Sequence, residues 1–235
     1  MRIRELTAAD MSEMSRLPSG STDDPDPPCA SCVFWEVPYA ARGGAGQEAT
    51  TAKVAWWQAQ ELERPTASRA AWSDGQLVGW ALAGEPAALP RARRMPSAPS
   101  DDALVLAVLW VDPQLRTHGV GRALLHSVLR DAVRRQRRAV EAYGDPSGQR
   151  LCAIDVKVLE ALGFETVSPH PTAPRMRLDL RSTVSWADSV AGALDRVVSA
   201  LARRERRAAA PARDVSAVGG PAGGALGADR LSPPW

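Results

Sequence analysis

The chain has 235 residues, of which 45% are hydrophobic and 24% charged, and its formal net charge is +2. This composition is typical of a globular protein with one core, and so balanced a charge favours neither nucleic acid nor an acidic partner. The N-terminal sequence contains no apolar signal segment and no apolar run has membrane-spanning length, so we expect a cytoplasmic protein that binds no membrane.

The first half of the chain predicts a strand, two helices and a hairpin. Residues 2–6 alternate like a short strand, and helical patterns cover 7–17 and 47–63. Asp74-Gly75 then separates apolar runs at 70–73 and 76–82, which is a strong hairpin signal because both turn residues must adopt a positive φ. The proline-rich segments 18–28 and 86–100 are expected to be loops.

The second half begins with the clearest pattern in the sequence. Residues 103–111 are all apolar and predict a buried strand, which Asp112-Pro113 ends because proline has no N–H for a ladder. Apolar residues recur with helical spacing from Gly121 to Arg135. Further strands are predicted at 139–143, 164–167 and 175–180, and a helix from about Cys152 to Leu162 that stops at Gly163.

A short loop, Arg116-Thr-His-Gly-Val-Gly121, joins the long strand to its helix. A helix entered in this way presents unpaired backbone N–H groups and a partial positive charge, which together suit an anion. The loop is neither a dinucleotide fingerprint, since Leu124 stands where a third glycine is needed, nor a P-loop, since no Gly-Lys-Ser/Thr follows.

The spacing Arg-x-x-Gly-x-Gly between a strand and a helix resembles the acyl-CoA pyrophosphate loop of the GNAT acyltransferase superfamily. The order of the elements and the segment Leu162-Gly163-Phe164 are similar to that superfamily too. The resemblance implies an α+β fold: a mixed, mostly antiparallel sheet of six to seven strands flanked by helices. We expect a GNAT-like domain over 1–181, an appended helix over 182–207 and a disordered tail over 208–235.

More narrowly, four segments resemble an uncharacterised actinobacterial GNAT group. They are Cys29-x-x-Cys32 with the aromatic residues after it, 140–145, 168–171 and 185–207. The cysteine pair supplies half of a zinc site, which Cys152 and His170 would complete only if the fold brought them together. Packing of free thiols is the simpler interpretation, a redox motif lacks its usual context, and we expect no metal.

The resemblance implies an N-acyltransferase that moves an acetyl group from acetyl-CoA to a small-molecule or protein amine by direct attack. The backbone of Leu109, Trp110 and Val111 would pair with the pantetheine arm. The pyrophosphate would lie on the loop formed by Arg116, Thr117, His118, Gly119, Val120, Gly121 and Arg122. The alternative is a non-catalytic acyl-CoA-binding sensor or interaction module, and either could be a monomer or a homodimer.

The proton-transfer group is less clearly marked. Members of the superfamily often use a tyrosine near the start of the helix after the fifth strand, but residues 152–162 contain none. Glu141 and Tyr143 lie two apart on one strand face and are candidates to meet the acceptor amine. Tyr143 also fits a core aromatic with a satisfied hydroxyl, and Cys152 is a third candidate, as a thiol donor near the CoA sulfur.

Overall fold

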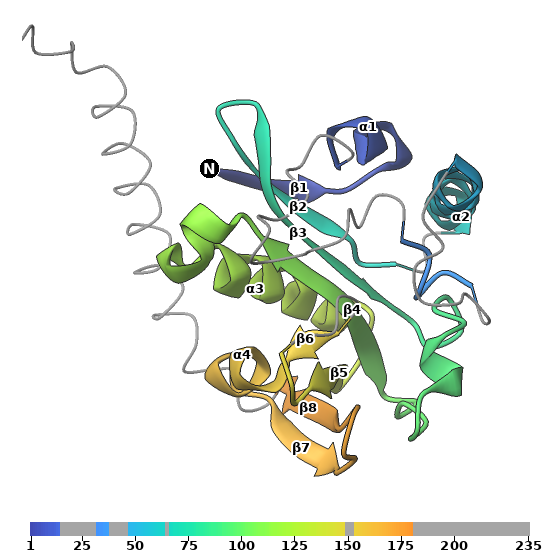
Figure 1. Ribbon diagram of the computed structural model, residues 1–235, viewed down its shortest axis with the longest axis vertical. Helices are drawn as coiled ribbons and strands as arrows, with labels where there is room; N and C mark the ends of the chain where they lie inside the picture. The colour runs from blue at the N-terminus through green and yellow to red at the C-terminus, as the bar shows by residue number, and fades with distance from the viewer. Residues whose placement is uncertain (15–31, 38–46, 64–65, 149–152, 181–235) are drawn as a thin grey trace, which may run out of the picture.

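The computed structural model describes residues 1–14, 32–37, 47–63, 66–148 and 153–180 (Figure 1). Cys29, Cys152, the predicted helix over 182–207 and the predicted tail lie outside the described residues. Within them, no helix is both long enough and apolar enough to cross a bilayer.

A single mixed sheet organises the described chain. Its order is β1 (Arg2–Glu5), β2 (Arg69–Ser73), β3 (Gln76–Gly84), β4 (Ala103–Val111), β5 (Ala139–Asp145), β8 (Arg175–Asp179) and β7 (Glu165–Ser168). All neighbours on this path are antiparallel except β4 and β5, and the short β6 (Ile154–Asp155) pairs in parallel with the end of β5. The predicted architecture, a mixed and mostly antiparallel sheet with flanking helices, is confirmed.

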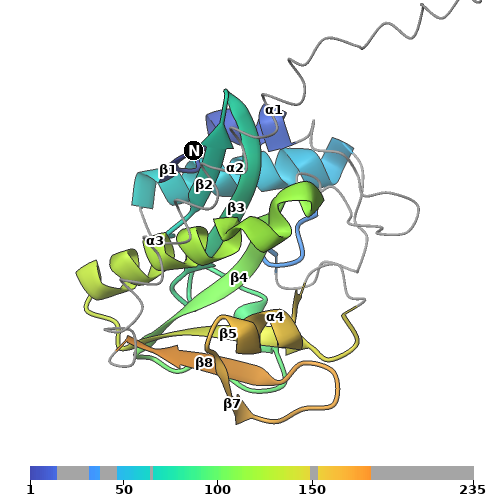
Figure 2. The same ribbon diagram turned by 90° about the vertical axis from the view of Figure 1, so that its left-hand side faces the viewer.

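Helices cover both faces of this sheet, as Figures 1 and 2 show. On one face lie α3 (Val120–Arg134) and α4 (Val156–Ala161), and on the other α1 (Met11–Met14) and α2 (Gln47–Glu63). The apolar stripe of α3 is buried against the sheet; its members are Val120, Ala123, Leu124, Leu125, Val128, Leu129 and Ala132. This stripe is what the sequence periodicity predicts.

The two faces carry different cores. The α3 face is mainly aliphatic, with Phe164 as its buried aromatic residue, whereas the α2 face is rich in aromatic residues and includes Trp35, Trp57, Trp80 and Tyr143. Alternation along the strands divides the side chains between these cores. We name the second one the aromatic core.

The hairpin between β2 and β3 forms at the predicted turn. Asp74 has φ 52° and Gly75 has φ 77°, as a two-residue turn with both φ values positive requires. The strands extend one residue earlier and two residues later than the alternation indicated, because pairing with β1 and β4 supports the additional residues.

The predicted start of the helix after β5 is wrong. Ile154 and Asp155 form a parallel bridge with Gly144 and Asp145, and α4 begins only at Val156. The Asp155 carboxylate accepts the Lys157 N–H at 2.7 Å and so caps the helix there. The bridge needs glycine at 144, because a Cβ there would lie 2.6 Å from the Val156 Cγ2.

The first predicted helix also begins later than the sequence indicates. Residues 8–10 form a 3-10 turn, and α1 covers only Met11–Met14 before the described segment ends. Thr7 and Asp10 form a capping box at the turn, in which Asp10 accepts the Thr7 N–H at 2.9 Å. The capping signal in the sequence is therefore real, but it starts a tighter turn.

Candidate active site

Strands β4 and β5 separate half-way along β4. Their parallel pairing runs from Ala103↔Ala139 to Leu106↔Ala142 and stops there. Ala107 is an extra residue in the pairing of β4 with β3, since Leu82 faces Val108 while Ala83 faces Leu106. Such a bulge bends its strand and increases the local twist, which accounts for the separation at this point.

The separation leaves one edge of β4 available. Beyond Ala107 the other edge of β4 continues to pair with β3 as far as Val111. β5 stays paired with β8 as far as Tyr143 and Arg175, and beyond that point it pairs with β6, where Gly144 faces Ile154. Among the described strands, none pairs with the free edge of β4 between Ala107 and Val111, so its N–H and C=O groups can receive an extended ligand.

The start of α3 lies directly beyond this free edge. The Asp112 carboxylate accepts the Gln114 N–H at 2.9 Å and begins a 3-10 turn over Pro113–His118. Gly119 follows with φ 86°, a left-handed conformation that glycine adopts without strain, and α3 begins at Val120. The first N–H groups of α3 have no acceptor within the helix, so they are available at the place where the sequence predicts an anion site.

Of the two glycines between the start of α3 and the strands, only Gly79 is needed for their close approach. A Cβ at Gly79 would lie 3.0 Å from the Trp110 O and 3.2 Å from the Val120 Cγ1, so the residue permits close packing of α3 on β3. A Cβ at Gly121 would lie 3.5 Å from the Val111 Cγ2 and 3.9 Å from the Leu109 Cδ2, which is ordinary contact. Alanine at position 121 is therefore compatible with the fold.

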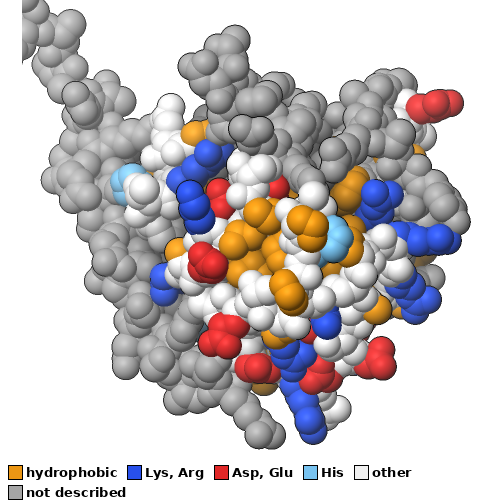
Figure 3. Space-filling model, turned by 60° about the horizontal axis from the view of Figure 1, so that its bottom comes forward, with side chains coloured by type: hydrophobic (Ala, Val, Ile, Leu, Met, Phe, Trp, Pro, Cys, Tyr) orange, Lys and Arg blue, Asp and Glu red, His pale blue; other side chains and the backbone are white. Residues whose placement is uncertain are grey.

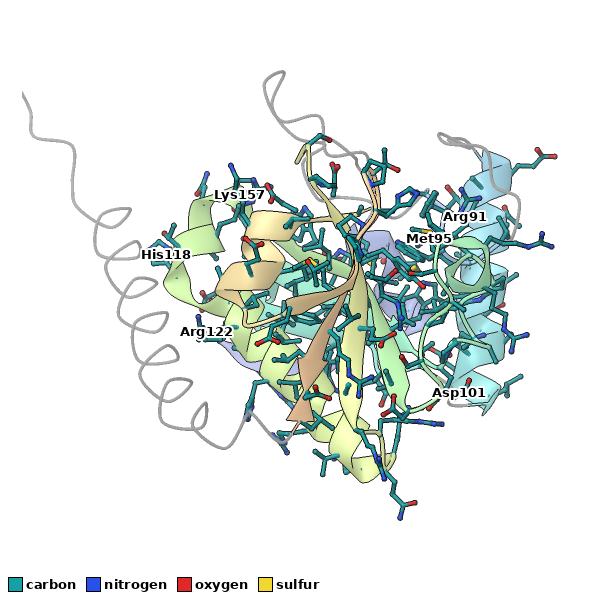
Figure 4. The ribbon with its side chains drawn as sticks, turned by 90° about the horizontal axis from the view of Figure 1, so that it is seen from below. Arg91, Met95, Asp101, His118, Arg122 and Lys157 are labelled. Carbon is teal, nitrogen blue, oxygen red and sulfur yellow. The ribbon has the colours of Figure 1, made fainter. Side chains whose placement is uncertain are left out.

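The side chains of the loop surround the helix start. The Arg116 Nε donates to the Val111 O at 3.4 Å, the Arg122 Nη2 donates to the Ala161 O of α4 at 3.1 Å, and the Thr117 hydroxyl lies 3.5 Å from the His118 Nδ1. Figure 4 shows His118, Arg122 and Lys157 on the same side of the sheet as α3, at one end of the molecule. The Arg122 contact joins the start of α3 to the end of α4.

The sequence model of the acetyltransferase (GNAT) family matches residues 33–164, which is more than half of the chain. This chain belongs to the acetyltransferase (GNAT) family. A search of curated proteins found no match.

Solved GNAT-like structures share this fold at low sequence identity. The PaiA N-acetyltransferase of Thermoplasma acidophilum, solved with coenzyme A, is 11% identical with a TM-score of 0.50, over 76% of this chain and 98% of that one. YncA of Salmonella typhimurium, solved with its cofactor acetyl-CoA, is 17% identical with a TM-score of 0.51, over 77% and 94%. An N-acetyltransferase of Staphylococcus aureus Mu50 is 15% identical with a TM-score of 0.50, over 76% and 98%.

In this GNAT fold the Glu141 carboxylate is fully buried and surrounded by donors. It accepts hydrogen bonds from the Ser100 N–H at 2.9 Å, the Ser100 hydroxyl at 2.7 Å and the Arg175 guanidinium at 2.9 Å. Burial by itself would raise the pKa of Glu141, but the hydrogen bonds from Ser100 and Arg175 outweigh it and hold the pKa below its ordinary value. The carboxylate therefore links the segment that precedes β4 with strands β5 and β8.

Tyr143 lies on the same side of β5 as Glu141 and also bonds to the segment that precedes β4. Its ring is 1% exposed and stacks on Trp35, with 6.2 Å between ring centroids. Its hydroxyl donates to the Ser97 O at 2.6 Å, and burial raises the pKa of Tyr143 to about 12. Both residues thus hold the segment between β3 and β4, which we name the 85–102 strap, against the aromatic core.

The cysteine pair is only partly described. Cys32 is half-buried, and its carbonyl accepts a hydrogen bond from the Lys53 Nζ at 2.6 Å. His170 uses its Nδ1 to accept the N–H groups of Thr172 and Ala173, at 3.2 and 3.1 Å. In the part of the chain that the structure describes, no group of three or more metal-ligating side chains comes together.

A buried ion pair was missed by the sequence reasoning. The Lys53 Nζ lies 2.5 Å from the Glu36 Oε1, and the two side chains are 2% and 1% exposed. Lys53 precedes Trp57 by four residues, so it falls on the buried stripe of α2. A lysine at this spacing from a tryptophan was the available signal, but its partner could not be identified from the sequence.

The lower face of the molecule carries both positively and negatively charged side chains. Figure 3 shows an apolar patch on the lower face, with basic and acidic side chains interspersed around it. The electrostatic potential over the described part of this face is therefore mixed in sign, in keeping with the formal net charge of +2.

Proposed function

We propose that this protein transfers an acetyl group from acetyl-CoA to an amine acceptor. The observation that carries the proposal is the free edge of β4 from Ala107 to Val111, which leads directly to the unpaired N–H groups at the start of α3. A pantetheine arm is an extended chain of amides, and a pyrophosphate is an anion. The two parts of this site match those two parts of the coenzyme in the same order along the chain.

The binding groups follow from this placement. The backbone of Leu109, Trp110 and Val111 would hydrogen-bond the pantetheine amides, as a neighbouring strand would. The N–H groups between Arg116 and Gly121 would hold the pyrophosphate, with Arg116 and Arg122 adding charge-assisted hydrogen bonds from the surface. Leu109 and Val111 face α3, whereas Val108 and Trp110 face the aromatic core, so the acceptor would approach from that second side.

The chemistry requires little of the side chains beyond placement. The neutral amine attacks the thioester carbonyl, the C–N bond forms and the C–S bond breaks. The proton lost by the amine goes to solvent, and the thiolate takes a proton in turn. A free backbone N–H of β4 would stabilise the charge on the carbonyl oxygen.

Of the three predicted catalytic residues, we propose that Glu141 and Tyr143 are positioning residues, because both are engaged by the 85–102 strap. Cys152 stays a prediction as the donor to the thiolate.

Calorimetric titration with acetyl-CoA tests the proposal. The Gly121→Val variant adds a branched side chain between the start of α3 and the Val111 and Leu109 side chains, where it would push the helix start away from the free end of β4. We expect its Kd to rise about 10- to 100-fold, the equivalent of one or two lost charge-assisted hydrogen bonds. Ser127→Ala, on the same helix but beyond its first turn, is the matched control and should leave the Kd unchanged. A folded Gly121→Val protein with wild-type affinity would contradict the proposed site.

Release of the CoA thiol in the presence of amines distinguishes the enzyme from a sensor. The absence of a tyrosine from α4 is the observation that favours a sensor. Binding of acetyl-CoA without transfer to any member of a broad amine panel would support that second function.

A further inference from the structure

Arg91 differs from the other arginines of this fold. It is half-buried, just before the 3-10 turn over Ala92–Arg94 in the 85–102 strap. Its guanidinium carbon lies 4.5 Å from the centroid of the Phe34 ring, and its Nε is buried without a hydrogen-bond partner. Among the described residues, no carboxylate forms an ion pair with this guanidinium.

The remaining half-buried arginines of the described chain all have acceptors. Arg4, Arg69, Arg137, Arg175 and Arg177 pair with carboxylates, and Arg122 and Arg135 donate to backbone carbonyls. A partly desolvated cation without an anion is unfavourable, because burial removes hydration that no partner replaces. Arg91 is therefore available to an anion from outside the fold.

Contacts of the neighbouring residues connect Arg91 to the point where β4 and β5 separate. Tyr143 is the first β5 residue beyond the last β4–β5 pair, and its hydroxyl lies 3.5 Å from the Ala92 O, next to Arg91 along the chain. The Arg91 N–H also lies 3.5 Å from the O of Trp35, which stacks on Tyr143. Figure 4 shows Arg91 and Met95 on the α2 side of the sheet, with His118 and Arg122 on the opposite side.

This side of the sheet is the one from which the acceptor would approach. Trp110, at the free end of β4, packs against the same aromatic core as Phe34 and Met95. The thioester would lie along the free edge of β4, near the separation. An acceptor whose amine reaches that carbonyl from the α2 side would have the rest of its body near Phe34 and Arg91.

We propose that Arg91 binds a carboxylate of the acceptor, so that the acceptors are amines that also carry a carboxylate, amino acids being the simplest. The inference rests on the proposed acetyl transfer and specifies its substrate class. The contact with the Phe34 ring restricts where the guanidinium can lie, and a planar fork suits a carboxylate because it offers two parallel hydrogen bonds.

Matched acceptors test the assignment. Amino acids and their C-terminal amides are offered with acetyl-CoA, and kcat/KM is measured from release of the CoA thiol. We expect the best acceptor to be an acid, with its amide reduced about 10- to 100-fold, as loss of a charged hydrogen-bonding partner predicts. The ratio of kcat/KM for the acid to kcat/KM for its amide is then compared between the wild-type protein and its variants. This comparison cancels the intrinsic reactivity of each amine.

Variants of two neighbouring arginines complete the experiment. Arg91→Met should reduce the ratio to near one, and Arg91→Lys should restore only part of it, since lysine lacks the planar fork. Arg93→Met, at an exposed position of the same turn, removes an equal charge and should keep the wild-type ratio.

Three results would overturn the inference: amides that react as well as acids in the wild-type protein, a ratio that Arg91→Met leaves unchanged, or acetyl-CoA binding without transfer to any acid. The first and third require no variant to fold. Failure to bind acetyl-CoA in calorimetry would instead overturn the proposed function itself, so the two failures are distinguishable.

Discussion

The buried pair of Lys53 and Glu36 provides the sharpest test of how the α2 side of the sheet is held together. Lys53→Met keeps most of the side-chain volume but removes the cation. It leaves the Glu36 carboxylate, which is 1% exposed, with the Trp35 N–H at 3.1 Å as its remaining donor among the described contacts. Breaking a buried pair by removing one partner costs about 3–5 kcal/mol, because the remaining charge is neither hydrated nor compensated.

The second substitution should recover much of that loss. Glu36→Gln in the Lys53→Met background removes the stranded charge but retains an oxygen for the Trp35 N–H. The Cys32 carbonyl still lacks its donor, which costs about 1–3 kcal/mol. Both variants share the loss at the Cys32 carbonyl, so we expect the double variant to be about 2 kcal/mol more stable than Lys53→Met alone, a difference that is large against a total stability of about 5–15 kcal/mol.

Urea unfolding followed by tryptophan fluorescence measures these differences, since Trp35 and Trp57 lie in the same core. Arg134→Met is the control, because Arg134 is 62% exposed and pairs with Asp131 one turn earlier on α3, so its loss should cost under about 1 kcal/mol. A Lys53→Met protein destabilised by no more than this control would refute the reasoning, and so would a double variant less stable than Lys53→Met.

Three further outcomes follow from the site. The pKa of Glu141 is held below its ordinary value of about 4.3, so the ionised carboxylate contributes fully to stability above that pH. This contribution is lost as the pH falls through the lowered pKa. Glu141→Gln should therefore weaken the loss of stability in acid, as measured by urea titrations at several pH values. Tyr143→Phe should cost about 1 kcal/mol by leaving the Ser97 carbonyl without its donor. With a Tyr143 pKa of about 12, the same variant should keep the wild-type pH–rate profile near neutrality, whereas a turnover rate lowered by about two orders of magnitude or more would make Tyr143 a catalytic acid. Gly144→Ala should destabilise the protein by about 1–3 kcal/mol in thermal melts, since its Cβ would meet the Val156 side chain; an unchanged melting temperature would contradict the tight packing of α4.

The strand, loop and helix of the proposed coenzyme site were the most predictable elements of the molecule. The apolar run of β4, the breaker Asp112-Pro113 and the amphipathic stripe of α3 are all adjacent in the sequence, and each depends on neighbours within a few residues. The Asp74-Gly75 turn is local in the same sense, because its conformation is a matter of two φ angles. Such features can be predicted without knowing what packs against them.

The roles of individual polar residues could not be predicted in this way. Alternation placed Glu141 and Tyr143 on one face of β5, but their partners, Ser100, Arg175 and Ser97, lie 34 to 46 residues away along the chain. Whether a carboxylate meets a substrate or a guanidinium depends on which strand lies beside it. That information is absent from the pattern of its own strand.

The sequence by itself therefore determined the strand, the loop and the helix that form the proposed coenzyme site, because short-range patterning controls secondary structure and helix ends. Only the tertiary structure decided that β4 and β5 separate after Leu106, that Lys53 meets Glu36, and that Arg91 has no anion among the described residues. Each of these depends on contacts between segments distant in the chain. Burial then decides how much each contact changes the free energy of unfolding. A charged group in water has little effect on stability, whereas a buried one is costly unless a partner compensates it.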